Sequence, residues 1–411
     1  HCSGGVVVTS SLSPSKLNGY KVYGGDGCQI TEEAAAAIEA SIGREPDLVD
    51  ALPSCEAGLA SGKISMIGED TVQAYYAMLA PLHMQPTATD LKIVYSPLNG
   101  TGNEPVREML KRMGKVEVIV VPEQEHPDGH FPTCSYPNPE MPEAMKLSGE
   151  LAVKTNADFC MATDPDCDRV GVGVVENGKL TLMTGNETGC LLLDYLCRFK
   201  KSAFAFKDAP VAVKTIVSTD MAGAICKKYG VELREVLTGF KYIGEQIGLL
   251  EKDGEAGRYL LGFEESYGYL TGTSVRDKDA VDASQMICEM AAWHKSQGRS
   301  LLDAMRGLYN EFGWYRQRLL SFTFEGIAGK ETMANLMAHL RKPDLTTLGG
   351  EAIEKRIDYA NDATGLPQSD VLSFLLTGGR KVIVRPSGTE PKLKAYLFAS
   401  GTDLADGDGK L

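Results

Sequence analysis

The sequence predicts an α/β protein made of doubly wound sheets, followed by a smaller α+β domain. Apolar strand-like runs alternate with helix-like stretches over residues 87–313, which is typical of parallel sheets covered by helices. Three polar loops each follow a predicted strand directly. Ligands of doubly wound sheets gather at the carboxyl ends of strands, so these loops predict a cleft between domains. From residue 314 the pattern changes to short strands and fewer helices.

Composition limits the classes of function. The chain has 411 residues, with 43% hydrophobic and 24% charged residues, which is ordinary for a soluble globular protein. The formal net charge of −13 argues against broad binding of nucleic acid or anionic membranes, and no apolar run approaches the length of a membrane span. We therefore expect a small-molecule partner. The sequence does not indicate an oligomeric state.

The ten cysteines form no Cys-x-x-Cys pair and lie mostly in apolar or helix-like stretches. This usage favours small buried thiols in a reducing compartment, so we expect a cytoplasmic protein. The chain has no initiator Met and His1 is followed almost at once by a strand pattern, so we also expect a fragment.

The first predicted domain, 1–86, begins with a strand at 6–8, a Ser-rich loop and a second strand near 20–23. Helices are predicted from residue 31 to Gly43 and over 71–82, before a proline-containing linker. The second domain, 87–203, has the following predicted elements: strands at 91–95, 115–121, 158–163, 170–175 and 179–183, and helices at 103–113, 143–155 and 186–200. Glu176-Asn177-Gly178 predicts a hairpin turn between its last two strands.

The third predicted domain, 204–313, repeats the alternation. Its expected elements are strands at 211–218, 231–237 and 258–262, and helices at 220–229, 243–251 and a third through His294. The fourth, 314–411, is expected to contain a strand at 316–323, helices at 331–340 and 350–358, and then short strands.

Asp164, Asp166 and Asp168 lie at alternate positions in a loop between two apolar runs. Three carboxylates that turn towards one point repel each other unless a cation binds there. All-oxygen ligands favour Mg²⁺, whose remaining coordination positions can be taken by phosphate oxygens. Arg169 could hold the same phosphate.

Other interpretations of this loop are a solvated acidic turn and an aspartyl-phosphate hydrolase, which also places Asp-x-Asp after a strand. An EF-hand is excluded, because Arg169 stands where that loop needs Gly and Val175 where it needs Glu.

Other loops carry groups suited to a phosphosugar. Ser11 is a candidate nucleophile, although serine is also an ordinary turn residue, and Lys21 is a nearby candidate proton acceptor or phosphate partner. Arg385-Pro386-Ser387-Gly388-Thr389 combines a guanidinium, hydroxyls and a glycine, as a phosphate cradle or an ordinary loop would. Glu264, Glu265 and Ser266 offer acceptors and a hydroxyl that suit sugar hydroxyls, although glutamates at a strand end are often only solvated.

Together these residues resemble the α-D-phosphohexomutase superfamily, most closely the bacterial phosphoglucomutases of the phosphoglucomutase/phosphomannomutase family. The likeness covers almost the whole chain. It rests on the following motifs: Asp-Pro-Asp-Cys-Asp-Arg at 164–169, Thr238-Gly239-Phe240-Lys241, Gly262-Phe263-Glu264-Glu265-Ser266, Arg276-Asp277-Lys278-Asp279 and Arg385-Pro386-Ser387-Gly388-Thr389-Glu390-Pro391-Lys392.

The resemblance implies three doubly wound α/β domains, the first partial, and a smaller fourth domain around a central cleft. It implies that Ser11 is phosphorylated and binds Mg²⁺ with the three aspartates, and that glucose 1,6-bisphosphate is the intermediate between glucose 1-phosphate and glucose 6-phosphate. The remaining implied site residues are Lys21 and Arg169 as catalytic groups, and Thr238, Gly239, Lys241, Glu264, Ser266, Arg276, Lys278, Arg385, Ser387, Gly388 and Thr389 as substrate-binding groups.

Beside Ser11 the chain departs from the family pattern Thr-Ala-Ser-His-Asn-Pro. Leu12 replaces its histidine and Ser13 its asparagine. Leucine can neither donate a hydrogen bond to a phosphoserine nor move a proton. A catalytically impaired sugar-phosphate-binding homologue and a phosphomannomutase therefore remain alternatives to a phosphoglucomutase.

Overall fold

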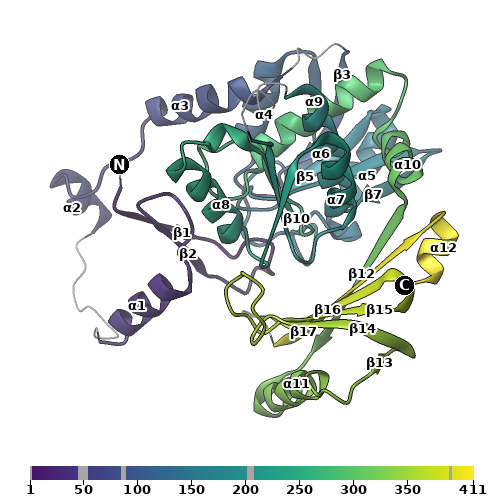
Figure 1. Ribbon diagram of the computed structural model, residues 1–411. Helices are drawn as coiled ribbons and strands as arrows, with labels where there is room; N and C mark the ends of the chain where they lie inside the picture. Colours follow the sequence, from purple (N-terminus) through teal and green to yellow (C-terminus); the bar gives the residue numbers. More distant parts are fainter. Residues whose placement is uncertain (1, 45–53, 85–88, 201–207, 388–390) are drawn as a thin grey trace.

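The computed structural model describes residues 2–44, 54–84, 89–200, 208–387 and 391–411. The strands of these residues form a two-stranded, a five-stranded, a four-stranded and a six-stranded sheet, in chain order (Figure 1). Helices cover the faces of the five- and four-stranded sheets, so the α/β architecture expected from the sequence is confirmed.

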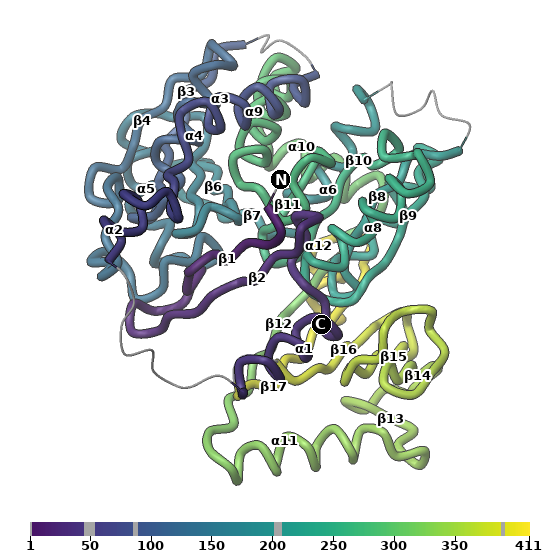
Figure 2. Tube along the Cα trace, turned by 90° about the vertical axis from the view of Figure 1, so that its left-hand side faces the viewer, coloured from purple at the N-terminus to yellow at the C-terminus, as the bar shows by residue number. Residues whose placement is uncertain are grey.

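The first sheet is an antiparallel hairpin of β1 (Gly4–Val8) and β2 (Tyr20–Gly24). After it come α1 (Glu32–Ile42), α2 (Cys55–Ala60), α3 (Glu69–Leu79) and the 3₁₀ turn η1 (Ala80–Leu82). The hairpin has little core of its own, because Val6 and Val8 are 65% and 72% exposed. In Figure 2 it lies between the five-stranded sheet above and the six-stranded sheet below.

The five-stranded sheet has the order β4-β3-β5-β6-β7. Its strands are β3 (Leu91–Ser96), β4 (Val116–Val120), β5 (Phe159–Thr163), β6 (Val170–Glu176) and β7 (Lys179–Met183). Strand β3 runs parallel to β4 and β5, and β6 and β7 form the antiparallel hairpin expected at 170–183. Asn177 and Gly178 both have positive φ in its turn, as a two-residue hairpin loop requires.

Both faces of this sheet are buried. Val94 faces a cluster with α5 (Pro142–Thr155), whereas its neighbours Ile93 and Tyr95 face one with α4 (Asn103–Met113) and α6 (Gly185–Phe199). Burial on both sides explains why the central strands read as continuous apolar runs in the sequence.

The four-stranded sheet has the order β11-β10-β8-β9. Its elements are β8 (Val211–Thr215), α7 (Met221–Tyr229), β9 (Glu232–Val236), α8 (Phe240–Lys252), β10 (Tyr259–Glu264), β11 (Gly268–Leu270), α9 (Ala280–Ser296) and α10 (Leu301–Phe312). Helix α9 packs against both this sheet and the five-stranded one, so one hydrophobic cluster joins them. The carboxyl ends of β5 and β10 are thereby held beside each other.

The six-stranded sheet is wholly antiparallel, in the order β12-β17-β16-β15-β14-β13. Its elements are β12 (Trp314–Thr323), α11 (Gly326–Leu340), β13 (Thr347–Leu348), β14 (Glu351–Asp358), β15 (Leu372–Leu376), β16 (Arg380–Pro386), β17 (Lys392–Gly401) and α12 (Leu404–Gly409). Met337 of α11 packs on one face, whereas Tyr396 and Phe398 on the other join the core of the four-stranded sheet. Figure 1 shows α11 below this sheet. The short 3₁₀ turn η5 (Thr377–Gly379) connects β15 to β16, and η2 (Pro122–Gln124) and η4 (Ala256–Arg258) lie in the preceding parts of the chain.

The helix expected at 350–358 is wrong, because residues 351–358 form β14. Gly349 and Gly350 have φ of 60° and 86° and make the turn that returns the chain antiparallel to β13. Ile353 and Ile357 then pair with β15, so tertiary pairing overrides the helical tendency of Glu, Lys and Arg.

Within the described residues, no helix is long and apolar enough to cross a membrane. All ten cysteines are free, and those of the central sheets and their helices are buried, as their apolar surroundings predict.

Asp282 makes the stability of the fold depend on pH. It is fully buried in α9 and accepts hydrogen bonds of 2.7 Å from the amide and the hydroxyl of Thr271. Burial, and then the charge of Asp279, raise the pKa of Asp282 to about 7. The folded protein therefore binds more protons than the unfolded chain between about pH 4 and pH 7, and its stability falls as pH rises through this range.

We expect Asp282→Asn to keep both contacts to Thr271 while removing this pH dependence. The loss of unfolding free energy between pH 5 and pH 8, measured by urea denaturation, should shrink by about 1–3 kcal/mol. Asp70→Asn, on the exposed side of α3, is the control. Equal pH dependence in the Asp282→Asn and unchanged proteins would contradict the prediction.

Candidate active site

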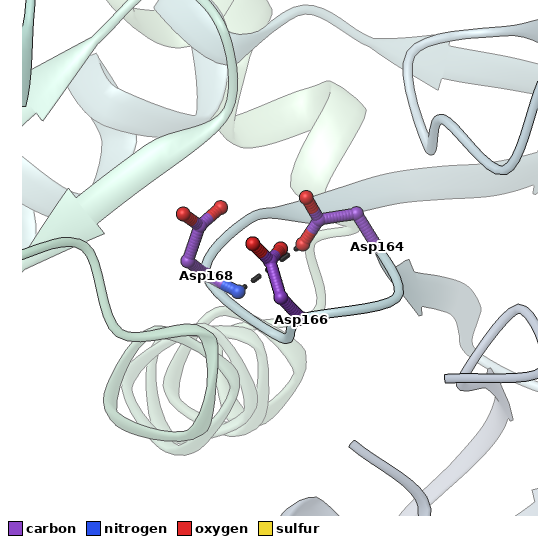
Figure 3. A group of neighbouring side chains, drawn as sticks. All are labelled: Asp164, Asp166 and Asp168. Carbon is purple, nitrogen blue, oxygen red and sulfur yellow. Dashed lines mark hydrogen bonds between the residues drawn. The ribbon is translucent and has the colours of Figure 1, made fainter. Parts of the chain in front are cut away.

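The three aspartates of the 164–169 loop converge, as the sequence predicts. Their ligand atoms lie within 4.8 Å of one another, and Figure 3 shows the three side chains on one side of the loop. The amides of Asp168 and Arg169 donate to Asp164 Oδ1 at 3.1 and 3.0 Å and hold the loop closed. The amide and hydroxyl of Thr101 donate to the carbonyl of Pro165, which fixes the loop from outside.

The carboxylates fit a divalent cation. Burial, and then the charges of Asp168 and Asp166, raise the pKa of Asp164 well above its usual range. Oδ1 of Asp166 and Oδ1 of Asp168 are buried and receive no hydrogen bond from the described residues. Buried acceptors without donors, in an all-oxygen set, are the ligands that Mg²⁺ prefers.

Two lysines from other parts of the chain reach the same carboxylates. Lys21 of β2 places Nζ 3.0 Å from Asp166 Oδ2 and 2.7 Å from Asp168 Oδ2. Lys278 places Nζ 3.0 Å from Asp168 Oδ2, with its side chain only 8% exposed. Although burial opposes it, the charges of Lys278, Arg169 and Lys21 lower the pKa of Asp168. The site therefore joins the hairpin, the aspartate loop and the 276–279 loop.

Ser11 also lies at this cluster. Its Oγ donates to Asp164 Oδ2 at 3.2 Å, although the two residues are 153 positions apart. Its φ of 49° is left-handed, a conformation that costs a residue with a Cβ about 1–2 kcal/mol. The predicted nucleophile and the predicted metal ligands thus meet.

Glu264 and Ser266, at the end of β10, form the side of the site next to Arg169, which we call the 264–266 wall. Ser266 Oγ donates to Glu264 Oε1 at 2.9 Å, and Glu264 is only 4% exposed. Arg169 donates to the carbonyl of Ser266 at 3.3 Å, and an isolated β-bridge joins Arg169 to Gly268. These bonds lock the end of β10 to the aspartate loop.

Two predicted substrate-binding cations lie elsewhere. Lys241 pairs with Glu32 at 2.7 Å and Arg276 pairs with Glu251, and both cations line a cavity of about 640 Å³ between α1 and α8. None of the three aspartates lines that cavity. At the start of α8, Gly239 has a φ of 126°. Oγ1 of Thr238 is buried without a hydrogen-bond partner among the described residues.

The predicted phosphate cradle is described only in part. Gly388 and Thr389 lie outside the described residues, and the amide of Ser387 donates to the carbonyl of Lys392 at 2.8 Å. Arg385 lies near Glu265 of the 264–266 wall. Burial, and then Glu264, raise the pKa of Glu265 to about 7, whereas Arg385 opposes that rise.

Sequence reasoning assigned no role to three residues of this region: Thr9, Tyr23 and Asp277. The Tyr23 hydroxyl donates to Asp277 Oδ2 at 2.7 Å, and the other Asp277 oxygen is 3.4 Å from Lys278 Nζ. Tyr23 lies two residues after Lys21 on β2, so the period of a strand places both on one face and was a usable signal. Nothing in the sequence indicated that Asp277 would meet Tyr23.

Comparisons with known proteins agree with this arrangement. Four family models match, described as phosphoglucomutase/phosphomannomutase alpha/beta/alpha domains I, II and III and the C-terminal domain, over residues 1–48, 73–178, 184–312 and 336–406. The chain is 36% identical over 410 residues to a Haemophilus influenzae protein named "Probable phosphomannomutase", covering 98% of this chain and 79% of that protein. It is 33% identical over 407 residues to a phosphoglucomutase of Staphylococcus haemolyticus, covering 96% and 73%.

Solved structures share the fold at lower identity. The open form of the Paramecium phosphoprotein pp63/parafusin, a phosphoglucomutase, matches with a TM-score of 0.70 and 16% identity, covering 99% of this chain and 77% of that one. An Aspergillus fumigatus N-acetylphosphoglucosamine mutase, solved with GlcNAc-6P and magnesium, matches with a TM-score of 0.58 and 15% identity, covering 99% and 86%. With matches along its length and relatives above 30% identity, this chain belongs to the phosphoglucomutase/phosphomannomutase family.

Proposed function

We propose that this protein interconverts glucose 1-phosphate and glucose 6-phosphate through a phosphoserine at Ser11. The observation that carries the proposal is the contact of 3.2 Å between Ser11 Oγ and Asp164 Oδ2, at three carboxylates suited to a cation. A phosphoryl group on Ser11 would lie where a metal and two lysines can neutralise its charge. The names of relatives such as the Staphylococcus haemolyticus phosphoglucomutase support the choice of sugar.

Each half-reaction balances with these groups. Phosphoserine gives its phosphoryl group to the free hydroxyl of the sugar phosphate, which forms glucose 1,6-bisphosphate and restores the serine hydroxyl. The bisphosphate then turns over and returns its other phosphoryl group to Ser11. In each half-reaction the attacking hydroxyl loses a proton and the leaving oxygen gains one. Lys21, whose ammonium pairs with Asp166 and Asp168, is the proposed relay: it gives a proton to the leaving oxygen and takes one from the attacking hydroxyl.

The aspartates are the proposed holders of Mg²⁺, together with Ser11. When bound, Mg²⁺ would withdraw charge from phosphate oxygens and help to hold them in line. Arg169 and Lys278 supply further positive charge beside Asp168. One structure of an Aspergillus fumigatus N-acetylphosphoglucosamine mutase contains magnesium, and another, of a variant of that mutase, contains glucose 1,6-bisphosphate.

The remaining predicted residues are proposed to bind the sugar and its second phosphate. Glu264 and Ser266 offer oxygens to sugar hydroxyls at the wall beside Arg169. Arg385, Ser387, Gly388 and Thr389 are the proposed cradle of the phosphate that does not react, and Thr238 and Gly239 contribute from the start of α8. Lys241 and Arg276 reach substrate only by exchanging Glu32 and Glu251 for phosphate oxygens.

We also propose the division into domains at 1–86, 87–203, 204–313 and 314–411. Each of the four sheets falls within one of these segments, which supports the division. The metal loop then belongs to the second domain, the sugar wall to the third and the phosphate cradle to the fourth, with the phosphoserine in the first.

A coupled assay tests the function. Glucose 1-phosphate, Mg²⁺ and a trace of glucose 1,6-bisphosphate should yield glucose 6-phosphate, and chelation of Mg²⁺ should stop the reaction. Mannose 1-phosphate should be assayed beside glucose 1-phosphate as the comparison substrate, because one relative is named "Probable phosphomannomutase". A higher kcat/KM for mannose 1-phosphate would favour that activity. Binding of glucose 1-phosphate without turnover would instead support the impaired homologue that Leu12 and Ser13 raise.

A further inference from the structure

The hydroxyl of Thr9 joins the Ser11 loop to the aspartate loop. It accepts a hydrogen bond of 2.8 Å from the amide of Ser11 and donates one of 3.0 Å to Asp166 Oδ2. One oxygen therefore fixes both the backbone of Ser11 and a carboxylate that is 157 positions away in the sequence.

Thr9 is itself held firmly. Its amide donates to the carbonyl of Gly19 at 2.9 Å, which continues the pairing of β1 with β2 beyond Val8. Threonine branches at Cβ and has a restricted χ1, so a fixed backbone also fixes the direction of its hydroxyl. The hairpin thus delivers this oxygen at a set place.

The contact matters because Ser11 is in a conformation that it does not favour alone. Its left-handed φ of 49° places Oγ 3.2 Å from Asp164. The bond from its amide to Thr9 stabilises that conformation from one side. On the other side, the amide of Ser13 closes a turn onto the carbonyl of Ser10 at 3.0 Å.

The same hydroxyl orients Asp166. Oδ2 of Asp166 accepts from both Thr9 and Lys21, each at 3.0 Å. Oδ1 then receives no donor from the described residues. Thr9 and Lys21 together turn the carboxylate so that one oxygen is committed to the protein and the other is free for a cation.

We propose that Thr9 is a positioning residue that sets Ser11 Oγ against Asp164 and keeps Asp166 Oδ1 free of protein donors. It acts through these two residues and need not touch substrate. The structural part of this inference stands on the contacts above, whereas its effect on turnover rests on the proposed function.

The test uses two variants of Thr9 and one control in the same loop. Thr9→Val keeps the shape and removes the hydroxyl, Thr9→Ser keeps the hydroxyl, and Ser10→Ala removes a neighbouring hydroxyl for which no hydrogen bond is found among the described residues. A crystal structure of Thr9→Val should show Ser11 outside the left-handed region, with its Oγ separated from Asp164. Thr9→Ser and Ser10→Ala should keep the original loop.

Kinetics give the second readout. Thr9→Val should lower kcat about 100-fold, because a small misplacement of a reacting group costs about that much, while KM for glucose 1-phosphate stays within about twofold. Thr9→Ser should restore most of kcat. After incubation with glucose 1,6-bisphosphate, intact mass should show a smaller phosphorylated fraction in Thr9→Val, but not in Thr9→Ser or Ser10→Ala. Thermal unfolding, if unchanged in all three variants, excludes a general loss of structure.

The outcomes separate the inference from the function. An unmoved Ser11 in the Thr9→Val structure would overturn the positioning role, whatever the activity. A displaced Ser11 in a chain whose parent shows no turnover would support the positioning role and count against the mutase. A fall in kcat that Thr9→Ser does not rescue would also contradict the inference, since the serine keeps the hydroxyl.

Discussion

Replacing Ser11 with alanine is expected to lower turnover of glucose 1-phosphate by more than about 10⁴-fold, because it removes the hydroxyl proposed to carry the phosphoryl group. The fold should not change. The Ser11 side chain is half-buried and makes one hydrogen bond, to Asp164, so its loss costs little stability. The coupled assay measures the first expectation and thermal unfolding the second.

Intact mass distinguishes the phosphoserine from its neighbours. Incubation with glucose 1,6-bisphosphate should add one phosphoryl group to the unchanged chain and none to Ser11→Ala. Ser13→Ala is the matched control, because it removes a hydroxyl from the same loop and should still gain the label. Phosphate found on Ser10 or Ser13 would show that the nucleophile has been placed at the wrong position of the loop.

Much of this site is local in the sequence, and that part could be predicted. The three aspartates lie within five residues that follow a buried strand, so short-range geometry alone brings them together. Glu264 is the last residue of β10, and Ser266 follows two residues later. Ligands of doubly wound sheets bind at the carboxyl ends of strands, so loops of this kind can be expected to line a site before any coordinate is known.

The contacts between distant segments could not be predicted. Lys21 reaches Asp166 and Asp168 across 145 and 147 positions. Its place shortly after Ser11 made it a candidate site residue, but no pattern in the sequence indicated that it would meet these two aspartates. The contact of Lys241 could not be predicted either. This residue belongs to a matching motif, yet its ammonium group meets Glu32 of α1, because the orientation of a flexible side chain depends on which acid its neighbours present.

The misassigned segment 350–358 has the same cause at the level of secondary structure. Its Glu, Lys and Arg residues suit a helix, whereas pairing with β13 and β15 favours a strand. β15 itself begins 14 residues after the end of β14, so local propensity carried no sign of it. Local patterns therefore predicted the aspartate loop at 164–169 better than they predicted the strands of the six-stranded sheet.

Asp168→Ala is expected to remove metal binding and also to destabilise the protein by about 3–5 kcal/mol, the usual cost of leaving a buried charge without its partner. Asp168 is 8% exposed and lies between Lys21, Lys278 and Arg169. Its removal leaves three cations close together. Because Lys278 is almost as buried, solvent cannot take over the role of the carboxylate.

Asp166→Ala is the matched comparison, because Asp166 is half-buried and pairs with Lys21 alone of these cations. Both variants should lose the rise in thermal midpoint that Mg²⁺ gives to the unchanged protein, since a ligand that binds only the folded state stabilises it. Only Asp168→Ala should also unfold at lower temperature without metal. Equal stability of the two variants would mean that Asp277 and Glu264 already balance the charges of Lys278 and Arg169, so that Asp168 would serve the metal alone.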